Sequence, residues 1–326
     1  MIISRTPFRM SFVGGGTDLE LYYSKEDGRV LSTTIDKYIY VVVKRQVAVV
    51  EHKYRINWST VEFKNRIEDI EHPIVREALK LMEIDFPIEI TTFADIPANT
   101  GLGSSSSFTV GLLHALFALK GQMVKKSELA AMASKIEIDI LGRRIGKQDH
   151  YAATYGNLNI FTFHPNHSVS VDPVFYKDEV RNAIQDRLML FYTQIKRNAS
   201  DVLSVQQKSM DRKHQVLTEM KNLVPQLGEV INERRELNEF GQILHRGWLL
   251  KKSISEEVSS TNIDEYYQKA MNAGALGGKL LGAGGGGFLV FSVSPENQEA
   301  VKKALSNVYQ LPFKFENSGT RITYYD

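Results

Sequence analysis

The chain has 326 residues, of which 43% are hydrophobic and 24% charged, the balance of a soluble globular protein with room for two domains. The chain has 40 basic and 38 acidic residues, so its formal net charge is only +2. This small charge argues against broad binding to nucleic acid or to a membrane surface. The absence of cysteine excludes disulfides, thiolate nucleophiles and cysteine-bound metals. No apolar run reaches the roughly 18 residues of a membrane span, and the first residues lack the apolar core of a signal peptide. We therefore expect a cytoplasmic protein.

Strand-like alternation dominates the first fifth of the chain, and helical spacing dominates the later half. The predicted strands lie at residues 30–43, 47–63 in part, 87–93, 157–163, 187–193 and 288–293, with two short ones between 311 and 324. The predicted helices lie at residues 73–82, 104–119, 127–141, 198–258 with breaks near Pro225 and Gly228, 263–272 and 295–308. This order favours an α+β fold with two domains, residues 1–182 and 183–326, divided at a polar stretch near 176–187.

The segment between the strand at 87–93 and the helix at 104–119 is the most informative one. It reads Pro97-Ala-Asn-Thr-Gly-Leu-Gly-Ser-Ser-Ser-Ser107. Glycine allows a tight turn and a close approach of a ligand to the backbone. The start of a helix offers unpaired N–H groups and partial positive charge, which suit a phosphate. One serine would suffice to cap the helix, so four serines after Gly-Leu-Gly indicate a nucleotide-phosphate site rather than a cap alone.

Two other glycine-rich segments do not fit nucleotide-binding motifs. Gly142 to Lys147 has three residues between its glycines, and Gln148 follows the lysine, so it is not a P-loop. Residues 282–287 satisfy G-x-G-x-x-G, but a predicted strand follows at 288–293. A dinucleotide fingerprint opens a helix, so the sequence excludes a dehydrogenase of that type.

Three segments in order resemble the motifs of the GHMP kinases, the family of galactokinase, homoserine kinase, mevalonate kinase and phosphomevalonate kinase. They are the serine-rich segment above, residues 5–18 (RTPFRMSFVGGGTD) and residues 277–287 (GGKLLGAGGGG). The Gly-Gly-Gly-Thr-Asp18 form, together with Gly146–Tyr151 (GKQDHY), is more similar to the heptose 7-phosphate kinases and fucokinase domains than to galactokinase, which has Gly-Glu-His-Thr-Asp. The resemblance implies a ribosomal protein S5 domain 2-like N-terminal domain and a ferredoxin-like C-terminal domain, with the active site between them.

The resemblance also implies roles for individual residues. The residues expected to bind ATP are Pro97, Gly101, Leu102, Gly103, Ser104, Ser105 and Ser106. Ser105 and Glu137 would hold Mg²⁺, although Glu137 could equally be an exposed carboxylate on its helix. Asp149 would be the general base or would orient the acceptor hydroxyl, with Arg9 beside it; a helix N-cap is the alternative for Asp149.

The acceptor pocket is expected near the first motif. Asp18 could accept hydrogen bonds from adjacent sugar hydroxyls, or could instead form an Asx-turn. The other expected substrate ligands are Gly15, Gly16, Thr17, Lys147, Arg197, Gly284 and Gly285. Lys147 and Arg197, with Lys196, are the candidates for a phosphate on the substrate, unless they are merely solvated.

These assignments favour an ATP- and Mg²⁺-dependent kinase acting on the anomeric hydroxyl of a sugar, with D-glycero-D-manno-heptose 7-phosphate as the preferred substrate. A kinase of free fucose or galactose and a non-catalytic sugar and nucleotide sensor stay open. An isoprenoid acid as acceptor is disfavoured, because Asp18 would repel its carboxylate. The sequence does not distinguish a monomer from a homodimer.

Overall fold

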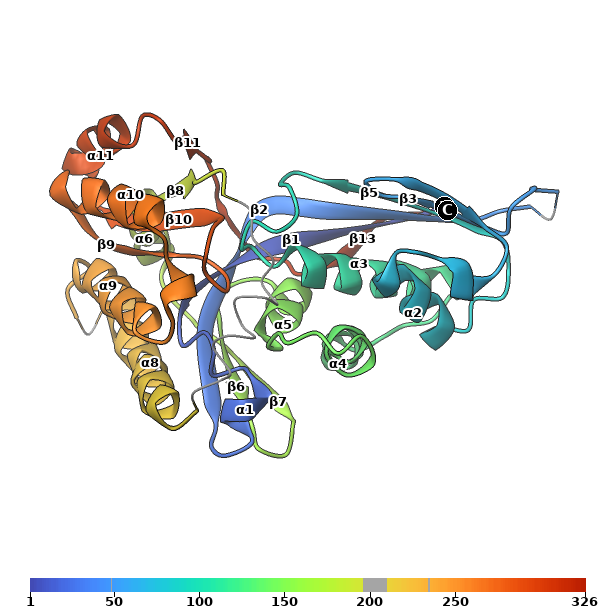
Figure 1. The fold of residues 1–326 in the computed structure, drawn as a ribbon, viewed down its shortest axis with the longest axis horizontal. Helices are drawn as coiled ribbons and strands as arrows, with labels where there is room; N and C mark the ends of the chain where they lie inside the picture. Colours follow the sequence, from blue (N-terminus) through green and yellow to red (C-terminus); the bar gives the residue numbers. More distant parts are fainter. Residues whose placement is uncertain (48, 196–209, 234) are drawn as a thin grey trace.

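The computed structural model describes residues 1–47, 49–195, 210–233 and 235–326. Two β-sheets, each with its own helices, lie along the long axis of the molecule (Figure 1). This arrangement confirms the predicted two-domain α+β fold. Within these ranges, no helix combines the length and the apolar character needed to cross a membrane.

The larger sheet has nine strands and is built mainly from the first half of the chain. Its main path runs β13-β1-β2-β5-β3-β4, and β6, β7 and β12 join it beside β2. The strands are β1 (Ile2–Val13), β2 (Gly28–Arg45), β3 (Tyr54–Asn57), β4 (Val61–Lys64), β5 (Ile88–Ala94), β6 (Asn159–Phe163), β7 (Val169–Pro173), β12 (Phe315–Glu316) and β13 (Arg321–Tyr325). The 18-residue strand β2 pairs with β6 through its first half and with β5 through its second half.

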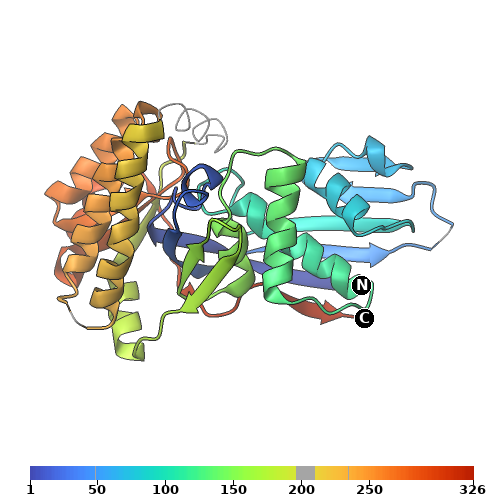
Figure 2. The same cartoon turned by 90° about the horizontal axis from the view of Figure 1, so that it is seen from below.

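Helices cover one face of this sheet (Figures 1 and 2). They are α2 (Pro73–Leu81), α3 (Ser104–Leu119), α4 (Lys126–Lys135) and α5 (Gln148–Tyr155), with the short α1 (Glu20–Tyr23) and η1 (Ile67–Asp69) nearby. Helix α3 is apolar on most of its sides and is buried along most of its length. Ser107 Oγ donates to the carbonyl of Pro7 at 2.9 Å and Ser4 Oγ to that of Gly111 at 2.7 Å. These bonds fix the start of α3 against β1.

The smaller sheet has the order β11-β8-β10-β9, and all its pairs are antiparallel. Its strands are β8 (Leu188–Tyr192), β9 (Ala275–Leu280), β10 (Phe288–Val293) and β11 (Tyr309–Gln310). The helices of this half are α6 (Asp178–Arg187), α8 (Met210–Ile231), α9 (Glu239–Lys252), α10 (Thr261–Asn272) and α11 (Gln298–Ala304), with η3 (Glu256–Val258) and η4 (Pro295–Asn297). Every residue of β10 is buried, as its nearly unbroken apolar run indicates.

Polar and aromatic contacts join the two halves. Lys279 of β9 donates to the carbonyls of Ser11 at 3.0 Å and Phe12 at 2.8 Å, both on β1. Phe12 also packs edge-to-face on Phe240 of α9, with 5.2 Å between ring centroids. The last strands, β12 and β13, pair with β2 and β1, although the sequence assigned everything after residue 182 to the second domain. The boundary itself stays a prediction.

Two predicted helix limits are corrected by the structure. Helix α8 continues through Pro225 and Gly228, where a break was predicted. A proline inside a helix costs about 3 kcal/mol, but Val224, Leu227 and Val230 are buried on the same helix, and each such side chain contributes about 1.5–3 kcal/mol. The predicted helix at 127–141 ends as one π-helical turn, η2 (Ile136–Ile140). That turn carries Glu137.

Candidate active site

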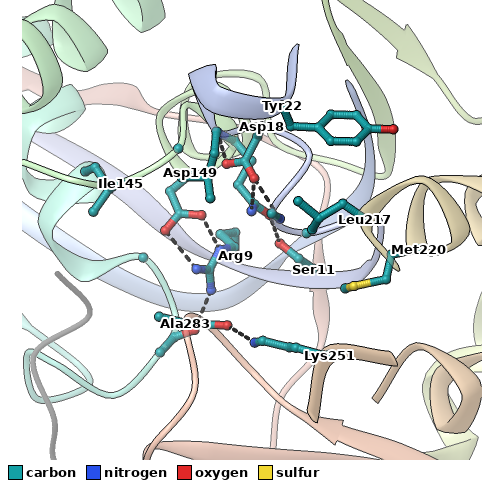
Figure 3. A pocket seen from close by; sticks show the side chains of 18 of the residues that line it. Arg9, Ser11, Asp18, Tyr22, Ile145, Asp149, Leu217, Met220, Lys251 and Ala283 are labelled. Carbon is teal, nitrogen blue, oxygen red and sulfur yellow. Dashed lines mark hydrogen bonds and ion pairs between the residues drawn. The ribbon is translucent and has the colours of Figure 1, made fainter. Parts of the chain in front are cut away.

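A cavity opens where the two halves meet, and most of the sequence-predicted site residues line it (Figure 3). Its first-domain wall consists of the end of β1, the loop after it, the serine-rich segment and the start of α5. Its second-domain wall consists of α8, the end of α9 and the loop after β9. The lining residues named in the sequence analysis are Arg9, Gly15, Gly16, Asp18, Gly101, Gly103, Ser104, Ser105, Ser106 and Asp149.

The serine-rich segment at residues 97–107, which the sequence predicts to bind phosphate and which is called the phosphate loop below, has the backbone geometry that its glycines predict. Gly101 and Gly103 adopt φ of 83° and 80°, which only glycine reaches without strain, and α3 begins directly after Gly103. A β-carbon on Gly101 would lie 2.5 Å from the carbonyl oxygen of Leu281, so the loop touches the second domain through bare backbone. The side chain of Leu102 is buried in the core instead, and its carbonyl accepts the backbone N–H of Arg9 at 3.1 Å.

Arg9 and Asp149 form a two-pronged ion pair inside the cavity. Arg9 Nε and Nη2 donate to the two carboxylate oxygens of Asp149 at 2.7 and 2.8 Å, and Nη1 donates to the carbonyl of Gly101 at 2.5 Å. Arg9 comes from β1 and Asp149 from the first turn of α5, so the pair joins segments 140 residues apart. A β-carbon on Gly103 would lie 3.1 Å from Asp149 Oδ2, which places the carboxylate directly at the start of α3. The guanidinium therefore orients Asp149 toward the phosphate loop.

Asp18 is buried and held by three N–H donors. Its carboxylate accepts the backbone N–H of Gly16 at 3.0 Å, and the backbone N–H and side-chain amide of Gln148 at 3.2 and 3.0 Å. Ser11 Oγ in turn donates to the amide oxygen of Gln148 at 2.7 Å. Burial, and then the nearby charge of Asp149, raises the pKa of Asp18. Since two carboxylate oxygens offer about four acceptor positions, the group can accept a further hydroxyl.

Glu137 is completely buried directly behind the phosphate loop. Ser105 Oγ and Thr109 Oγ1 donate to its carboxylate, and His150 Nε2 lies 3.0 Å from it. The guanidinium of Arg143 donates to both Glu137 at 2.5 Å and Ser105 Oγ at 2.6 Å. Burial alone would raise the pKa of Glu137, but the hydrogen bond and charge of His150, followed by Ser105 and Arg143, lower it to about 2.

The pair formed by Ser105 and Glu137 fits a magnesium ion by its chemistry. A hydroxyl and an ionised carboxylate are hard oxygen donors, and Mg²⁺ commonly takes only one or two protein ligands. The two groups together already bind a cation, because the Arg143 guanidinium donates to both Ser105 Oγ and the Glu137 carboxylate. Within the described residues, no group of three or more acidic or histidine side chains could hold a metal ion elsewhere.

The second-domain wall combines apolar and basic side chains. Leu217 and Met220 of α8 and Ile254 after α9 face the cavity, and Tyr22 from the first domain stacks on His214 of α8 with 4.9 Å between ring centroids. Lys251, at the end of α9, is a cation on this wall that points toward Arg9 (Figure 3). Its ammonium donates to the carbonyl of Gly282.

Comparisons with known proteins agree with this geometry. A family model described as GHMP kinases N terminal domain matches residues 73–157, and one described as GHMP kinases C terminal matches residues 210–311. The D-glycero-alpha-D-manno-heptose 7-phosphate kinase of Campylobacter jejuni is 31% identical to this chain, and the alignment covers 98% of each sequence. The chain belongs to the GHMP kinase family. It is therefore a kinase, with ATP as its phosphoryl donor.

More distant GHMP kinases resemble the chain over nearly its full length. A crystal structure described as a D-glycero-D-manno-heptose 1-phosphate kinase from Bacteroides thetaiotaomicron superposes with a TM-score of 0.82 at 25% identity, covering 100% of both chains. A galactokinase from Thermotoga neapolitana is 23% identical, covering 96% of this chain and 95% of the galactokinase.

Several residues expected to contact ligands in this GHMP kinase lie elsewhere. Thr17 is buried, and its hydroxyl bonds the carbonyls of Gly14 and Arg29 at 2.8 and 2.9 Å. The Lys147 ammonium lies over the Tyr23 ring and donates to the carbonyl of His167 at 3.3 Å, away from the cavity. Pro97, Leu102, Lys147, Thr17, Gly284 and Gly285 are not among the cavity-lining residues, and Arg197 lies outside the described residues. Glu137 does not line the cavity itself, but its carboxylate contacts Ser105, which does.

Other contributors were not singled out from the sequence. Gln148 and Gly146 belong to a motif that was recognised, but their roles depend on packing: a β-carbon on Gly146 would lie 1.9 Å from Asp18 Oδ2. Arg143 and Lys251 carry no local motif, and only the fold brings them to the site.

Proposed function

We propose that this GHMP kinase transfers the γ-phosphoryl group of ATP to the anomeric hydroxyl of a sugar, and that the sugar is D-glycero-D-manno-heptose 7-phosphate, which becomes the 1,7-bisphosphate. The observation that carries the proposal is the Arg9–Asp149 pair, which faces the start of α3 beside the buried Asp18. Phosphoryl transfer needs an aligned acceptor hydroxyl and balanced charge more than it needs covalent chemistry.

The residues of the first-domain wall have different roles in the transfer of the phosphoryl group. The backbone N–H groups and hydroxyls at Ser104–Ser106 hold the nucleotide phosphates at the positive end of α3. Asp149 accepts a hydrogen bond from the acceptor hydroxyl and takes its proton as the new bond forms, while Arg9 keeps the carboxylate oriented. Asp18 accepts a hydrogen bond from a second sugar hydroxyl. Ser105 and Glu137 would hold Mg²⁺, which supplies positive charge to the phosphate oxygens.

The choice of heptose 7-phosphate rests on relatedness. The Campylobacter jejuni relative named for that substrate is 31% identical across 98% of the chain, whereas the galactokinase and the Arabidopsis thaliana protein named for fucokinase are 23% and 22% identical. The sensor alternative is weaker, because Arg9, Ser105, Glu137 and Asp149 are all present and in mutual contact or close proximity.

A coupled assay of ADP release tests the proposal with heptose 7-phosphate, fucose, galactose and mevalonate as acceptors. We expect the highest kcat/KM with heptose 7-phosphate, with the product carrying its new phosphate at the anomeric carbon by ³¹P and ¹³C NMR. A preference for a free sugar would replace the substrate but keep the reaction. Silence with all four acceptors, together with saturable ATP and sugar binding, would favour the sensor.

A further inference from the structure

Lys251 is a half-buried cation in the cavity that the chemistry described above does not use. It lies in the last turn of α9, and its side chain enters the cavity from the second-domain wall (Figure 3). The hydrogen bond that its ammonium makes within the described residues goes to the carbonyl of Gly282. An ammonium has three N–H donors, so donors are left for a ligand.

A short series of contacts connects Lys251 to the reacting groups. Gly282 packs directly on the phosphate loop, since a β-carbon on it would lie 2.6 Å from Gly101 Cα. The carbonyl of Gly101 accepts Arg9 Nη1 at 2.5 Å, and Arg9 holds Asp149. Arg9 of the first domain thus donates to the carbonyl of Gly101, and Lys251 of the second domain donates to that of Gly282. These two glycines are in backbone contact with each other.

The charges around Lys251 indicate an anion as its partner. Burial lowers the pKa of Lys251 to about 7, with Arg9 acting in the same direction and Asp18 and Asp149 in the opposite one. The other ionisable side chains that line the cavity away from the first-domain wall are Lys279 of β9, and Lys213 and His214 of α8. An incoming phosphoryl group would restore the proton on Lys251 and offset the neighbouring cations.

We propose that Lys251 is a catalytic residue that contacts the phosphoryl group in transit, from the side of the second domain and opposite Arg9. This inference rests on the proposed kinase reaction. The bond from the γ-phosphorus to the bridging oxygen of ADP breaks, and a bond to the acceptor oxygen forms. The acceptor proton passes to Asp149. Lys251 stays protonated throughout and stabilises charge on the transferring oxygens.

Three variants test this role: Lys251→Met, Lys251→Arg and, as a matched control, Lys252→Met. Lys252 is the next residue on the same helix, but it forms an ion pair with Asp264 at 2.7 Å, outside the cavity. We expect Lys251→Met to lower kcat about 100-fold or more with KM values changed less than about threefold. Lys251→Arg should recover part of the loss, and Lys252→Met should match the wild type. Thermal denaturation checks that all three fold.

A pH profile and a binding measurement distinguish contact with the transferring group from a role in nucleotide binding or in folding. The wild-type kcat/KM should decline above about pH 7 as Lys251 loses its proton, and Lys251→Arg should not show that decline. Lys251→Met should weaken binding of ADP with aluminium fluoride, a mimic of the transferring group, while binding ADP alone as the wild type does. The binding measurement with ADP and aluminium fluoride needs no sugar, so it can be interpreted even if none of the four acceptors is phosphorylated.

Three results would overturn the inference. Unchanged kcat in Lys251→Met would remove the residue from the reaction. An equal loss of affinity for ADP alone would make it a nucleotide ligand. A raised KM for heptose 7-phosphate with an unchanged kcat would assign it to the phosphate that the substrate already carries.

Discussion

The two walls of the cavity are built in different ways. The first-domain wall is held by hydrogen bonds and ion pairs between distant segments, such as Arg9 with Asp149 and Gln148 with Asp18. The second-domain wall presents apolar side chains such as Leu217 and Met220 beside basic ones such as Lys251, with few polar contacts to distant segments within the described residues. We infer a division of labour: the first wall positions the acceptor hydroxyl and the nucleotide phosphates, and the second contributes Lys251 and shapes the space available to the acceptor.

The largest effect is expected at Asp149. Asp149→Asn keeps the shape but cannot accept the acceptor proton, and it loses the ionic pair with Arg9. Turnover should fall about 1000-fold or more, while ADP affinity by calorimetry stays within about twofold. Asp139→Asn, which alters an exposed carboxylate on the nearby π-turn, is the control and should be fully active. More than a tenth of wild-type turnover in Asp149→Asn would remove this residue from the mechanism.

Glu137 should make the stability of the first wall sensitive to acid. Its pKa is lower in the folded protein, about 2, than its ordinary value of 4.5, so its contribution is complete above pH 4.5 and is lost as the pH falls toward 2. The loss amounts to about 3 kcal/mol of unfolding free energy. Urea unfolding between pH 5 and pH 2.5 should show a steeper decline for the wild type than for Glu137→Gln. Parallel declines would contradict the assignment.

Gly103→Ala should damage the reaction more than the fold. The new methyl would lie 3.1 Å from Asp149 Oδ2 and would push the carboxylate out of line, in addition to straining a backbone with φ of 80°. We expect kcat to fall about 10- to 100-fold. Gly121→Ala introduces a similar positive-φ strain, at 66°, into open space beyond the other end of the same helix. It should cost about 1–2 kcal/mol of stability, seen by denaturation, with normal turnover.

The smallest loss of activity is expected for the substitution of Leu217, an apolar residue of the second-domain wall. Leu217→Ala removes apolar surface that lies against the loop of Gly16, where a β-carbon would be 2.9 Å from a Leu217 methyl. The KM for the sugar should rise about tenfold with the nucleotide KM unchanged, in line with the worth of one truncated apolar contact. Leu249→Ala, on the half-exposed side of α9, should leave both values as they are. A tenfold loss of kcat instead would show that Leu217 helps to position the reacting groups and does not merely shape the acceptor space.

The same contrast explains what could be predicted from the sequence. The phosphate loop and α3 follow from a motif whose glycines and serines have backbone requirements that few alternatives satisfy, and the closeness of Arg9 to Asp149 follows from the resemblance to the GHMP kinases. Lys251 and Leu217 have no such signature, because any amphipathic helix carries lysines and leucines, and only packing decides which of them face the cavity. The burial of Thr17 was missed for the same reason. Pro225 was overestimated as a helix breaker, because its local cost is outweighed by buried neighbours that belong to the tertiary structure.

The pairing of β13 with β1 has a consequence during synthesis. The strand that carries Arg9 is made long before residues 321–325, its neighbour on one side. At about 5–20 residues per second, that edge stays open for roughly 15 to 60 s. A nascent chain therefore holds Arg9 on an unfinished sheet until residues 321–325 have been made.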